Sequence, residues 1–272
     1  MPTATRLGHD AALCWPWQQP AIPVPDALTL TVRENTPITP TVRRLVVDLG
    51  GVPLAYQAGQ GASIGAHGQR ERRPYSIASA PSDSSVSGTI EFLLRANPVG
   101  GLGRHLDGVG AGSRLDFEGP FGAFVLPDVL PDGPLLFVAG GTGLAPLRSL
   151  AREARARGHA GPHHLIYSVR DAVDVAYPDE LATWPDDHHG EAIVTVTRHV
   201  PEDWRGRRGR IDLPLLRRFV GTRPPLCFLC GPTEMLDVLS RHLSQLGVPA
   251  DHVRTEQWSQ DAKADVHMPI GR

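Results

Sequence analysis

A buried strand followed at once by a glycine turn and a helix constrains this 272-residue chain more than any other stretch. Residues 134–139 (PLLFVA) form a continuous apolar run, which is typical of a strand covered on both faces of a parallel sheet. The glycines of residues 140–143 (GGTG) permit a tight turn. The helix expected over Leu144–Gly158 would point its unpaired N–H groups at a diphosphate. This stretch predicts an α/β unit with a nucleotide at its turn, and a turn that merely requires glycine is the alternative.

The same alternation of strand and helix continues through the second half of the chain. Strand-like runs recur at His164–Val169, Ala192–Val200, Pro225–Cys230 and His252–Trp258. Helical segments fit between several of them, at Leu213–Val220 and at Thr233–Leu246, where leucines recur at spacings of three and four. Because such alternation implies a parallel sheet, we expect an α/β domain with a parallel five-stranded sheet over residues 134–260 and a C-terminal tail over 261–272.

The first half of the chain has the period-two pattern of short strands. Apolar and polar residues alternate from Leu28, and the pattern resumes at residues 42–47 after a turn. Further strands are expected at Ala62–Gly65, Tyr75–Ala78, Thr89–Arg95 and Ser113–Glu118. Strands at this spacing favour an antiparallel barrel of roughly a hundred residues. We assign it residues 27–130, with the boundary at residues 127–133, and treat residues 1–26 as an N-terminal extension.

Composition and charge exclude several classes of protein. The net charge of −2 argues against a nucleic-acid-binding domain. The chain has no run of 18 apolar residues and no secretory signal pattern, so we expect no membrane span and a cytoplasmic location. Three cysteines are too few for a disulfide scaffold. Cys227 and Cys230 are not expected to form a redox pair, because residues three apart on a strand face opposite sides. The sequence does not indicate the oligomeric state.

Residues 73–76 (RPYS) combine a basic side chain, an aromatic ring and a hydroxyl just before an apolar run. On an extended strand Arg73 and Tyr75 would share one side and Ser76 would oppose them. A phosphate-seeking guanidinium beside a flat hydrogen-bonding ring suits a ligand with a charged tail and an aromatic head, such as a flavin nucleotide. The alternative is an ordinary strand with a surface arginine and a half-buried tyrosine.

Two further segments have the chemistry of nucleotide-binding turns. Residues 100–106 (GGLGRHL) close the fifth barrel strand and begin a short helix, which would form a second anion site, or else an ordinary loop. Residues 230–233 (CGPT) end a strand of the predicted parallel sheet, at the edge where such sheets bind their ligands. Both segments therefore favour nucleotide binding.

Other polar clusters lack the spacing that catalysis or metal binding needs. The doublets His163-His164 and His188-His189 have no carboxylate or cysteine partners at metal-ligand spacing, so we expect solvated loop residues and no metal site. Ser76 has no local His or Asp pattern, which disfavours a nucleophilic hydrolase. The arginine-rich stretch Arg198–Arg218 is expected to be a solvated face or loop, with a docking surface for an acidic partner as the alternative.

In this order, the motifs resemble those of the ferredoxin–NADP⁺ reductase superfamily. The family pattern is R-x-Y-S on a flavin-binding barrel, then G-G-T-G-x-A-P, then C-G-P, then a C-terminal Glu followed closely by an aromatic residue. The counterparts here are residues 73–76, 140–146 and 230–232, and Glu256 with Trp258. The match extends from about Leu28 to Trp258. The resemblance implies a flavin-binding Greek-key β-barrel followed by an NAD(P)-binding α/β domain.

The resemblance also implies roles for individual residues. Arg73 would pair with a flavin phosphate, Tyr75 would lie against the isoalloxazine, and Ser76 would hydrogen-bond near flavin N5. Cys230 would lie near the nicotinamide and Glu256 at the junction of the two rings, so Ser76, Cys230 and Glu256 are the candidate catalytic residues. The candidate cofactor-binding residues are Arg73, Pro74, Tyr75, Ser76, Leu93, Arg95, Gly100, Gly101, Leu102, Gly103, Gly141, Thr142, Gly143, Pro146, Ser168, Arg170, Arg198, Cys230, Gly231, Pro232 and Trp258.

The chain departs from the family pattern at two positions. Gly103 stands where relatives usually have a Ser or Thr whose hydroxyl contacts the flavin diphosphate, and glycine leaves only the backbone N–H. Trp258 follows Gln257, whereas relatives often end in an acidic residue, a basic residue and Phe or Tyr. The first departure predicts weaker flavin binding or a different dinucleotide pose.

The choice of nicotinamide cofactor depends on groups near the adenosine ribose. Ser168 and Arg170 follow the second parallel strand and Arg198 follows the third, where a 2′-phosphate would lie. A hydroxyl with two guanidiniums favours NADPH, and NADH is the alternative because Asp171 is adjacent. The R-x-Y-S-I-A-S sequence with a following glycine-rich segment resembles the FAD branch rather than the FMN branch.

The expected activity is that of an NAD(P)H-dependent flavoprotein reductase. NADPH would give hydride to FAD, and electrons would pass to a separate acceptor such as a ferredoxin or an oxygenase component. The sequence has no cysteine cluster for an iron–sulfur centre of its own. Two alternatives stay open: a reductase of diffusible acceptors such as free flavin, a quinone or ferric chelates, and a flavin-binding subunit without turnover.

Overall fold

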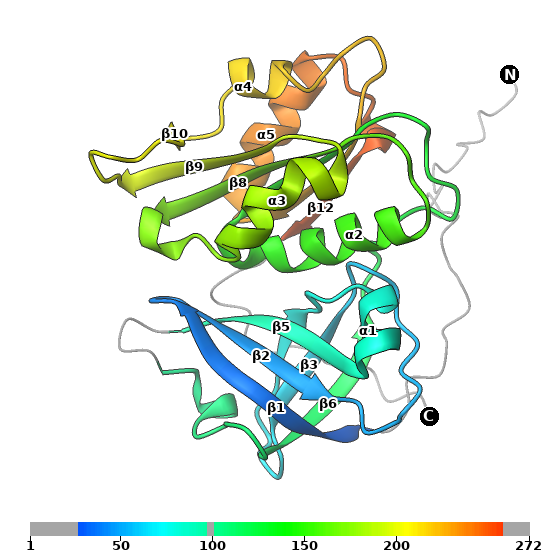
Figure 1. Cartoon of the computed structure of the whole chain (residues 1–272), viewed down its shortest axis with the longest axis vertical. Helices are drawn as coiled ribbons and strands as arrows, with labels where there is room; N and C mark the ends of the chain where they lie inside the picture. The colour runs from blue at the N-terminus through cyan, green and yellow to red at the C-terminus, as the bar shows by residue number, and fades with distance from the viewer. Residues whose placement is uncertain (1–26, 97–100, 258–272) are drawn as a thin grey trace, which may run out of the picture.

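The computed structural model describes residues 27–96 and 101–257, which form two bodies stacked along the long axis (Figure 1). The N-terminal extension, residues 97–100 and the C-terminal tail lie outside the described residues. The lower body in Figure 1 is an antiparallel barrel and the upper body is a parallel sheet with helices on both faces. The predicted order of the two folds is therefore confirmed.

The barrel consists of six strands in the order β4-β3-β6-β1-β2-β5. Ile77, directly after β4, pairs with Phe92 of β5, and this bridge closes the sheet on itself. Strands β3, β6 and β1 are neighbours without being consecutive in sequence, which is the Greek-key connection. Its elements are β1 (Leu28–Thr39), β2 (Val42–Asp48), β3 (Gly61–Ala66), β4 (Arg73–Ser76), α1 (Pro81–Ser87), β5 (Thr89–Arg95), a 3₁₀ turn (Arg104–Leu106) and β6 (Arg114–Phe121).

The barrel encloses a core that follows from the period-two pattern. In β1 the side chains of Leu30 and Val32 are buried, while Thr31 and Arg33 between and after them are more accessible. Phe92 and Phe117 from β5 and β6 fill the same core. Alternate side chains of a strand point to opposite faces, so one face of each strand builds the core and the other faces solvent or the second body.

The second body is a sheet of six parallel strands in the order β10-β9-β8-β7-β11-β12. The sixth strand, beyond the five predicted, is β10, whose two residues pair with Thr195 and Val196 and are too few to give a sequence signal. The elements are β7 (Leu135–Gly140), α2 (Leu144–Ala156), β8 (His163–Asp171), α3 (Pro178–His188), β9 (Ala192–His199), β10 (Arg207–Arg208), α4 (Leu213–Arg217), β11 (Leu226–Gly231), α5 (Thr233–Gln245) and β12 (Val253–Gln257), with 3₁₀ turns at Gly141–Gly143, Ala172–Asp174 and Ala250–His252.

The sheet is buried on both faces, as its apolar strands predicted. Phe137 of β7 faces the core shared with α2 and α3, whereas Val138 faces the core shared with α4 and α5. The two cysteines of β11 divide in the same way: Cys230 belongs to the first core and Cys227 to the second, and both are free. The expectation that they do not form a redox pair is confirmed.

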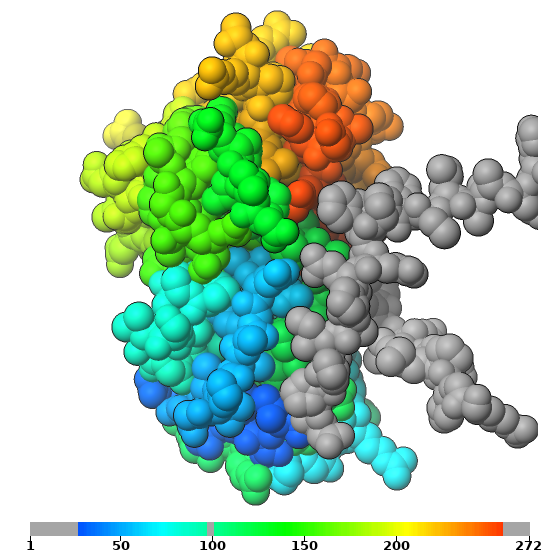
Figure 2. Space-filling model, turned by 90° about the vertical axis from the view of Figure 1, so that its right-hand side faces the viewer, coloured from blue at the N-terminus to red at the C-terminus, as the bar shows by residue number. Residues whose placement is uncertain are grey.

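Helix α2 lies between the sheet and the barrel (Figure 1). The hydrophobic cluster around it includes Leu147 and Leu150 of the helix, together with Ala78 and Leu93 from the barrel side. In the space-filling view the barrel and the α/β body meet along a continuous boundary (Figure 2). Burial of one apolar cluster shared by the two bodies holds them together.

Candidate functional site

A cavity of about 570 Å³ opens at the junction of the two bodies. Most of the predicted flavin residues line it from the barrel side, and the predicted nicotinamide residues line it from the other. The barrel contributes Arg73, Pro74, Tyr75, Ser76, Leu93, Arg95, Gly101 and Gly103, and the α/β body contributes Thr142, Gly143, Cys230 and Glu256. Residues that are far apart in the sequence are thus brought to one cavity, which is large enough for part of a dinucleotide.

Strand β4 pairs with β3 along its whole length, and all four of its residues line the cavity. Tyr75 pairs with Ala62 of β3, and Ser76 pairs with Gly61. A Cβ atom at Gly61 would lie 2.6 Å from the Tyr75 carbonyl oxygen, so only glycine lets β3 approach this closely. Arg73 is half exposed and donates two hydrogen bonds to Glu71 Oε1, at 2.9 and 2.7 Å.

Two of the predicted catalytic side chains converge on a carboxylate oxygen of the third. Ser76 Oγ donates a hydrogen bond of 3.1 Å to Glu256 Oε2, and Cys230 Sγ lies 3.6 Å from the same oxygen. Cys230 faces Glu256 because β11 and β12 pair in register at these two residues. Ser76 comes from the barrel, so the hydrogen bond crosses from one body to the other. Sequence motifs separated by up to 180 residues therefore meet at one point.

The electrostatics of this cluster follow from its burial. Burial raises the pKa of Glu256, and the hydrogen bonds from Ser76 and Cys230 partly offset that rise. Burial, with the nearby Glu256 carboxylate, raises the pKa of the Cys230 thiol well above its usual value. Cys230 is therefore a neutral thiol at neutral pH, and burial favours the protonated form of Glu256 more than in water.

The glycine turn after β7 is shaped by close packing against β11. A Cβ atom at Gly143 would lie 2.3 Å from the Cys230 carbonyl oxygen, and Gly141 has a positive φ of 56°. Both positions thus require glycine. The turn leads into the 13-residue helix α2, whose N-terminus points unpaired N–H groups and the positive end of the helix dipole toward the cavity.

A second cavity, of about 380 Å³, lies beside the first at the carboxyl ends of β8 and β9. It is lined by the predicted Ser168, Arg170 and Arg198, and also by Arg210, which sequence reasoning missed. Arg210 follows the short strand β10, and the missed strand explains the missed residue. Asp171 is not among the lining residues, and its carboxylate is paired with His199, but two other carboxylates, Asp174 and Glu234, line the cavity together with the arginines.

The two cavities meet at Thr142 and Arg95, which line both. Arg95 ends strand β5, and its pKa is lowered by burial and by the positive charge of Arg170 from the other body. Two guanidiniums from different bodies thus lie near each other at this junction. Such a pair is suited to a polyanion that passes from one cavity to the other.

Some predicted residues lie elsewhere. Leu102 packs against the barrel core and Pro146 is buried in the first turn of α2, so neither lines a cavity. Gly231 also lines neither: a Cβ atom there would lie 2.5 Å from Met235 Cε, so this glycine permits close packing of β11 on α5. Pro232, with Gly140 and Gly141, lines the second cavity. The predicted Gly100 and Trp258 lie outside the described residues.

His105 is a residue of the flavin half that sequence reasoning did not assign. Its ring is 1% exposed and stacks on Tyr75 with a centroid separation of 5.8 Å, and His105 Nε2 lies 2.7 Å from Tyr75 Oη. Burial, followed by the charge of Arg73, lowers the pKa of His105 to about 4, so the ring is neutral. A Cβ atom at Gly103 would lie 2.8 Å from His105 Nδ1, so the imidazole occupies the space beneath this glycine.

The expectation that the histidine doublets are solvated loop residues is wrong for three of the four, because His163 and His188 are buried and His164 is half-buried on β8 against Phe219. His163 and His188 are buried and form a chain with His159, with nitrogen separations of 2.9 and 3.2 Å. His163 begins strand β8 and His188 ends helix α3, so both face the core instead of a loop. Burial lowers the pKa of His163 to about 2 and that of His188 to about 4, and both are neutral.

Comparison with known proteins places both bodies in described families. Residues 29–126 match the oxidoreductase FAD-binding domain and residues 137–241 match the oxidoreductase NAD-binding domain. The chain is 35% identical over 221 residues to the reductase subunit of an aromatic O-demethylase from Amycolatopsis sp., covering 77% of this chain and 63% of that one. It is also 35% identical over 238 residues to ferredoxin–NADP reductase B of Sorangium cellulosum, covering 82% and 93%.

Solved structures give the same result. The Amycolatopsis cytochrome P450 reductase superposes with a TM-score of 0.74 at 30% identity, covering 85% of this chain and 69% of that one. The ferredoxin reductase in carbazole 1,9a-dioxygenase superposes with a TM-score of 0.75 at 25% identity, covering 88% and 71%.

The chain spans less than two thirds of the first of these relatives but nearly all of the Sorangium reductase. Over residues 27–96 and 101–257, no helix is long and apolar enough to cross a membrane. The matched domains establish FAD and NAD(P)H as cofactors. The glycine cradles, the guanidiniums and the aromatic ring of the two cavities fit both. The chain belongs to the ferredoxin–NADP⁺ reductase-like family of FAD- and NAD(P)-binding oxidoreductases.

Proposed function

We propose that this protein takes hydride from NADPH onto FAD and passes the electrons to a separate protein, a ferredoxin or an oxygenase component. The observation that carries the proposal is the contact of Ser76 from the barrel with Glu256 from the α/β body, at the cavity where both cofactors would meet. When bound, FAD supplies the redox chemistry by accepting hydride from the nicotinamide and releasing electrons to the acceptor.

On this proposal the barrel residues hold the flavin. Arg73 would bind a flavin phosphate, Tyr75 would present its ring to the isoalloxazine, and Ser76 would turn its single hydroxyl hydrogen from Glu256 toward N5. Burial raises the pKa of Tyr75 to about 12, which keeps the phenol neutral and able to donate through its hydroxyl. Ser76 is held in place by Glu256, and the raised pKa of that carboxyl suits a group that carries a proton near the reacting atoms.

The second cavity holds the nicotinamide nucleotide, and its charge supports NADPH over NADH. The diphosphate lies at the turn formed by Gly141, Thr142 and Gly143. Three arginines, Arg170, Arg198 and Arg210, line this cavity with Ser168 as a hydroxyl donor, and together with Arg95 they outnumber its two carboxylates, Asp174 and Glu234. A phosphate bound by several guanidiniums makes charge-assisted hydrogen bonds that NADH, with a hydroxyl there, cannot make.

The choice of a protein acceptor rests on the relatives. They include a reductase component of propane 2-monooxygenase from Mycolicibacterium goodii and the reductase subunit of an aromatic O-demethylase. The three cysteines of the sequence cannot supply the four thiolates that an iron–sulfur cluster needs. By analogy with these reductase subunits and components, the electron-accepting centre is proposed to belong to another protein. We also propose a cytoplasmic location, where NADPH is available, and a division into a FAD domain over 27–130 and a nucleotide domain over 134–260.

Anaerobic titration of the purified, FAD-loaded protein tests the hydride step. We expect the visible flavin absorbance to bleach with one equivalent of NADPH and to bleach more slowly with the same concentration of NADH. Absence of bleaching with either nucleotide would contradict the reductase proposal and leave a flavin-binding subunit. FAD, rather than FMN, should be released on mild denaturation.

Steady-state turnover tests the acceptor. With NADPH as donor, a small ferredoxin should be reduced faster than free FMN, a quinone or a ferric chelate at equal concentration. Faster reduction of the small molecules than of the ferredoxin would show that the acceptor is diffusible. The proposal for the hydride step would still stand.

A further inference from the structure

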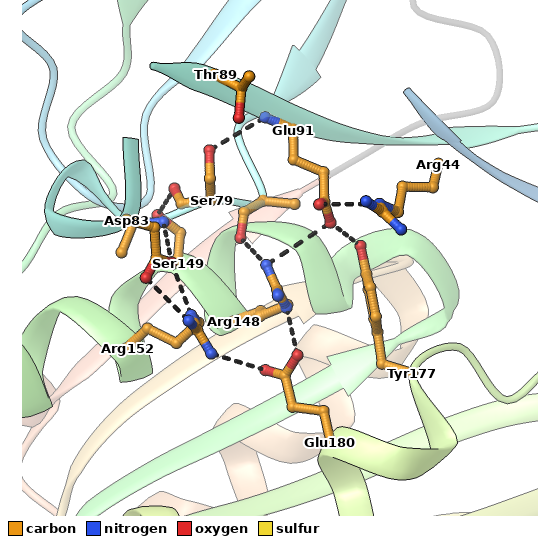
Figure 3. A network of polar contacts seen from close by, with 12 residues as sticks. Arg44, Ser79, Asp83, Thr89, Glu91, Arg148, Ser149, Arg152, Tyr177 and Glu180 are labelled. Carbon is orange, nitrogen blue, oxygen red and sulfur yellow. Dashed lines mark hydrogen bonds and ion pairs between the residues drawn. The ribbon is translucent and has the colours of Figure 1, made fainter. Parts of the chain in front are cut away.

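Helix α2 carries a row of polar side chains on the face that packs against the barrel (Figure 3). Arg148 and Ser149 are consecutive on this helix, Arg152 lies about one turn beyond Arg148, and each of the three contacts a barrel residue. The same helix begins at the nucleotide-binding turn, so its N-terminus faces the cofactors while its middle holds the barrel. Of the two arginines, Arg148 is the more deeply buried.

The guanidinium of Arg148 is almost fully enclosed, with 13% of the side chain exposed. Arg148 Nη1 donates a hydrogen bond of 2.9 Å to the Ala78 carbonyl, and Nε donates one of 2.8 Å to Glu180 Oε2. Nη1 also lies 3.7 Å from Glu91 Oε1, and the guanidinium carbon lies 4.6 Å from the Tyr177 ring centroid. Burial disfavours the charge, but Glu180, Tyr177 and Glu91 outweigh it and raise the pKa of Arg148.

The hydrogen bonds that α2 makes to the barrel involve the segment directly after Ser76. Ala78 is two residues beyond Ser76, and the carbonyl of the next residue, Ser79, accepts a hydrogen bond of 2.7 Å from Ser149 Oγ. Successive carbonyls after strand β4 are thus fixed to successive residues of α2. The position of Ser76 relative to the N-terminus of α2 is set by these bonds rather than by apolar packing alone, because hydrogen bonds specify direction as well as distance.

The partners of Arg148 are themselves tied to both bodies. Glu91, on barrel strand β5, accepts a hydrogen bond of 3.0 Å from Arg44 Nε and one from the Tyr177 hydroxyl (Figure 3). Tyr177 immediately precedes helix α3 and has a φ of 53°, in the left-handed region that side-chain-bearing residues rarely adopt. A conformation of this kind persists only where the surroundings fix it. The network is therefore rigid on the side of the α/β body as well.

Arg152, one turn further along α2, provides a comparison within the same network. It makes two hydrogen bonds to Asp83 of helix α1, at 2.7 and 2.9 Å, and is 37% exposed. Asp83 lies seven residues beyond Ser76. Arg152 shares Glu180 with Arg148, at 3.9 Å from Nη1 to Oε1, but makes no contact with Ala78 or Glu91 among the described residues. Arg152 thus joins the two bodies as Arg148 does, but at their periphery.

We propose that Arg148 is a positioning residue for hydride transfer, which fixes the Ser76 segment relative to the nucleotide-binding end of α2. The inference rests on the proposed function, because it assumes that the flavin lies at Ser76 and the nicotinamide nucleotide at the turn before α2. Arg148 touches neither cofactor in this assignment. It acts by holding the two binding surfaces at one separation, and displacement of about 1 Å between reacting groups costs roughly 100-fold in rate.

Arg148→Gln, with Arg152→Gln as the matched control, tests the proposal on the full FAD-loaded chain. The rate of flavin bleaching at saturating NADPH is measured by anaerobic stopped flow. We expect Arg148→Gln to lower this rate at least about 20-fold while its half-saturating NADPH concentration changes less than about threefold. Arg152→Gln should stay within about twofold of the wild type in rate, although its melting temperature falls.

A spectroscopic measurement separates positioning from loss of stability. Adding NADP⁺ to the oxidised wild-type protein should perturb the flavin absorption spectrum, since the two rings come into contact. The perturbation should be lost in Arg148→Gln and kept in Arg152→Gln, with FAD content unchanged in both. If Arg148→Gln does not fold, Arg148→Lys serves in its place, because lysine keeps the charge but donates from a single nitrogen. It should also lose the spectral change.

Two results would overturn the proposal. One is a bleaching rate in the Arg148 variant within twofold of the wild type. The other is a loss of rate in both variants that simply follows their melting temperatures. Failure of the wild type to bleach at all would instead contradict the proposed function, so the two failures are distinguishable.

Discussion

Replacement of Gly103 by serine tests how the flavin half of the site is built. The family pattern has a hydroxyl-bearing residue here, and its absence from the sequence suggested weaker flavin binding. The structure gives a different reason for glycine: a Cβ atom would lie 2.8 Å from His105 Nδ1 and 2.9 Å from Cε1. Carbon atoms in proteins do not approach so closely, so the imidazole would have to move.

The loss of stability expected for Gly103→Ser follows from the surroundings of His105. The ring is 1% exposed and stacked on Tyr75, so it has little free space into which it can shift. Forcing additional atoms into a packed site costs about 1–3 kcal/mol. Moving the ring also breaks the 2.7 Å hydrogen bond to Tyr75 Oη, at about 1 kcal/mol. Gly103→Ser should therefore lower the free energy of unfolding by about 2–4 kcal/mol and the melting temperature by about 5–10 °C.

Thermal unfolding and FAD titration, followed by quenching of FAD fluorescence, measure the two effects. We expect Gly103→Ser to melt earlier and to bind FAD more weakly, because Tyr75 loses its support. Gly103→Ala adds the same Cβ without a hydroxyl and should behave alike. The double variant Gly103→Ser with His105→Ala removes the clash and should recover part of the loss in melting temperature. Tighter FAD binding by Gly103→Ser at an unchanged melting temperature would refute this reasoning.

Three further predictions concern the rest of the molecule. Arg170→Ala should raise the Michaelis constant for NADPH by about 10- to 150-fold, since a charged hydrogen bond to phosphate contributes roughly 1.5–3 kcal/mol. In steady-state kinetics the Michaelis constant for NADH should change little. Equal effects on both cofactors would contradict the assignment of Arg170 to the 2′-phosphate. Glu256→Ala should slow flavin bleaching by about 100-fold at unchanged FAD content, and an unaltered stopped-flow rate would remove Glu256 from the reaction. Because His188 has a folded-state pKa of about 4, below its unfolded value of 6.5, the unfolded chain binds more protons between these values. The part of the stability that depends on neutral His188 should be full above pH 6.5 and fall by about 3 kcal/mol as the pH drops toward 4. Since buried His163 adds its own loss over the same range, urea denaturation of His188→Gln should show a weaker pH dependence than the wild type.

The parts of the site that sequence reasoning predicted are local in the chain. Residues 73–76, 140–143 and 230–232 each combine a special backbone shape with the side chains that use it, so a short stretch carries the whole signal. The buried apolar run of β7 and the alternation of β1 likewise follow from neighbouring residues. These features depend on covalent geometry and burial pattern, which the sequence shows directly.

What was missed depends on partners from distant segments. His163 and His188 were expected in solvent because nothing near them in sequence marks them as buried, yet they face one core from β8 and α3. The role of His105 depends on its contact with Tyr75, thirty residues earlier. The position of Arg210 depends on the short strand β10, which no periodicity in the sequence indicates. Polar residues acquire such roles from the side chains that surround them, and hydrophobic patterning does not specify those partners.

Helix α2 connects the nucleotide-binding turn directly to the barrel segment that carries Ser76. Its N-terminus follows Gly143, and Arg148 lies five residues further on, which is about 7.5 Å along the helix axis. The helix is packed on β7 through Leu147 and Leu150, so it moves as one unit. One helix therefore holds both the nucleotide proposed to bind at its first turn and the barrel segment bound to Arg148. A change at either end must alter the geometry at the other, which is why a residue that touches no cofactor is expected to control the rate.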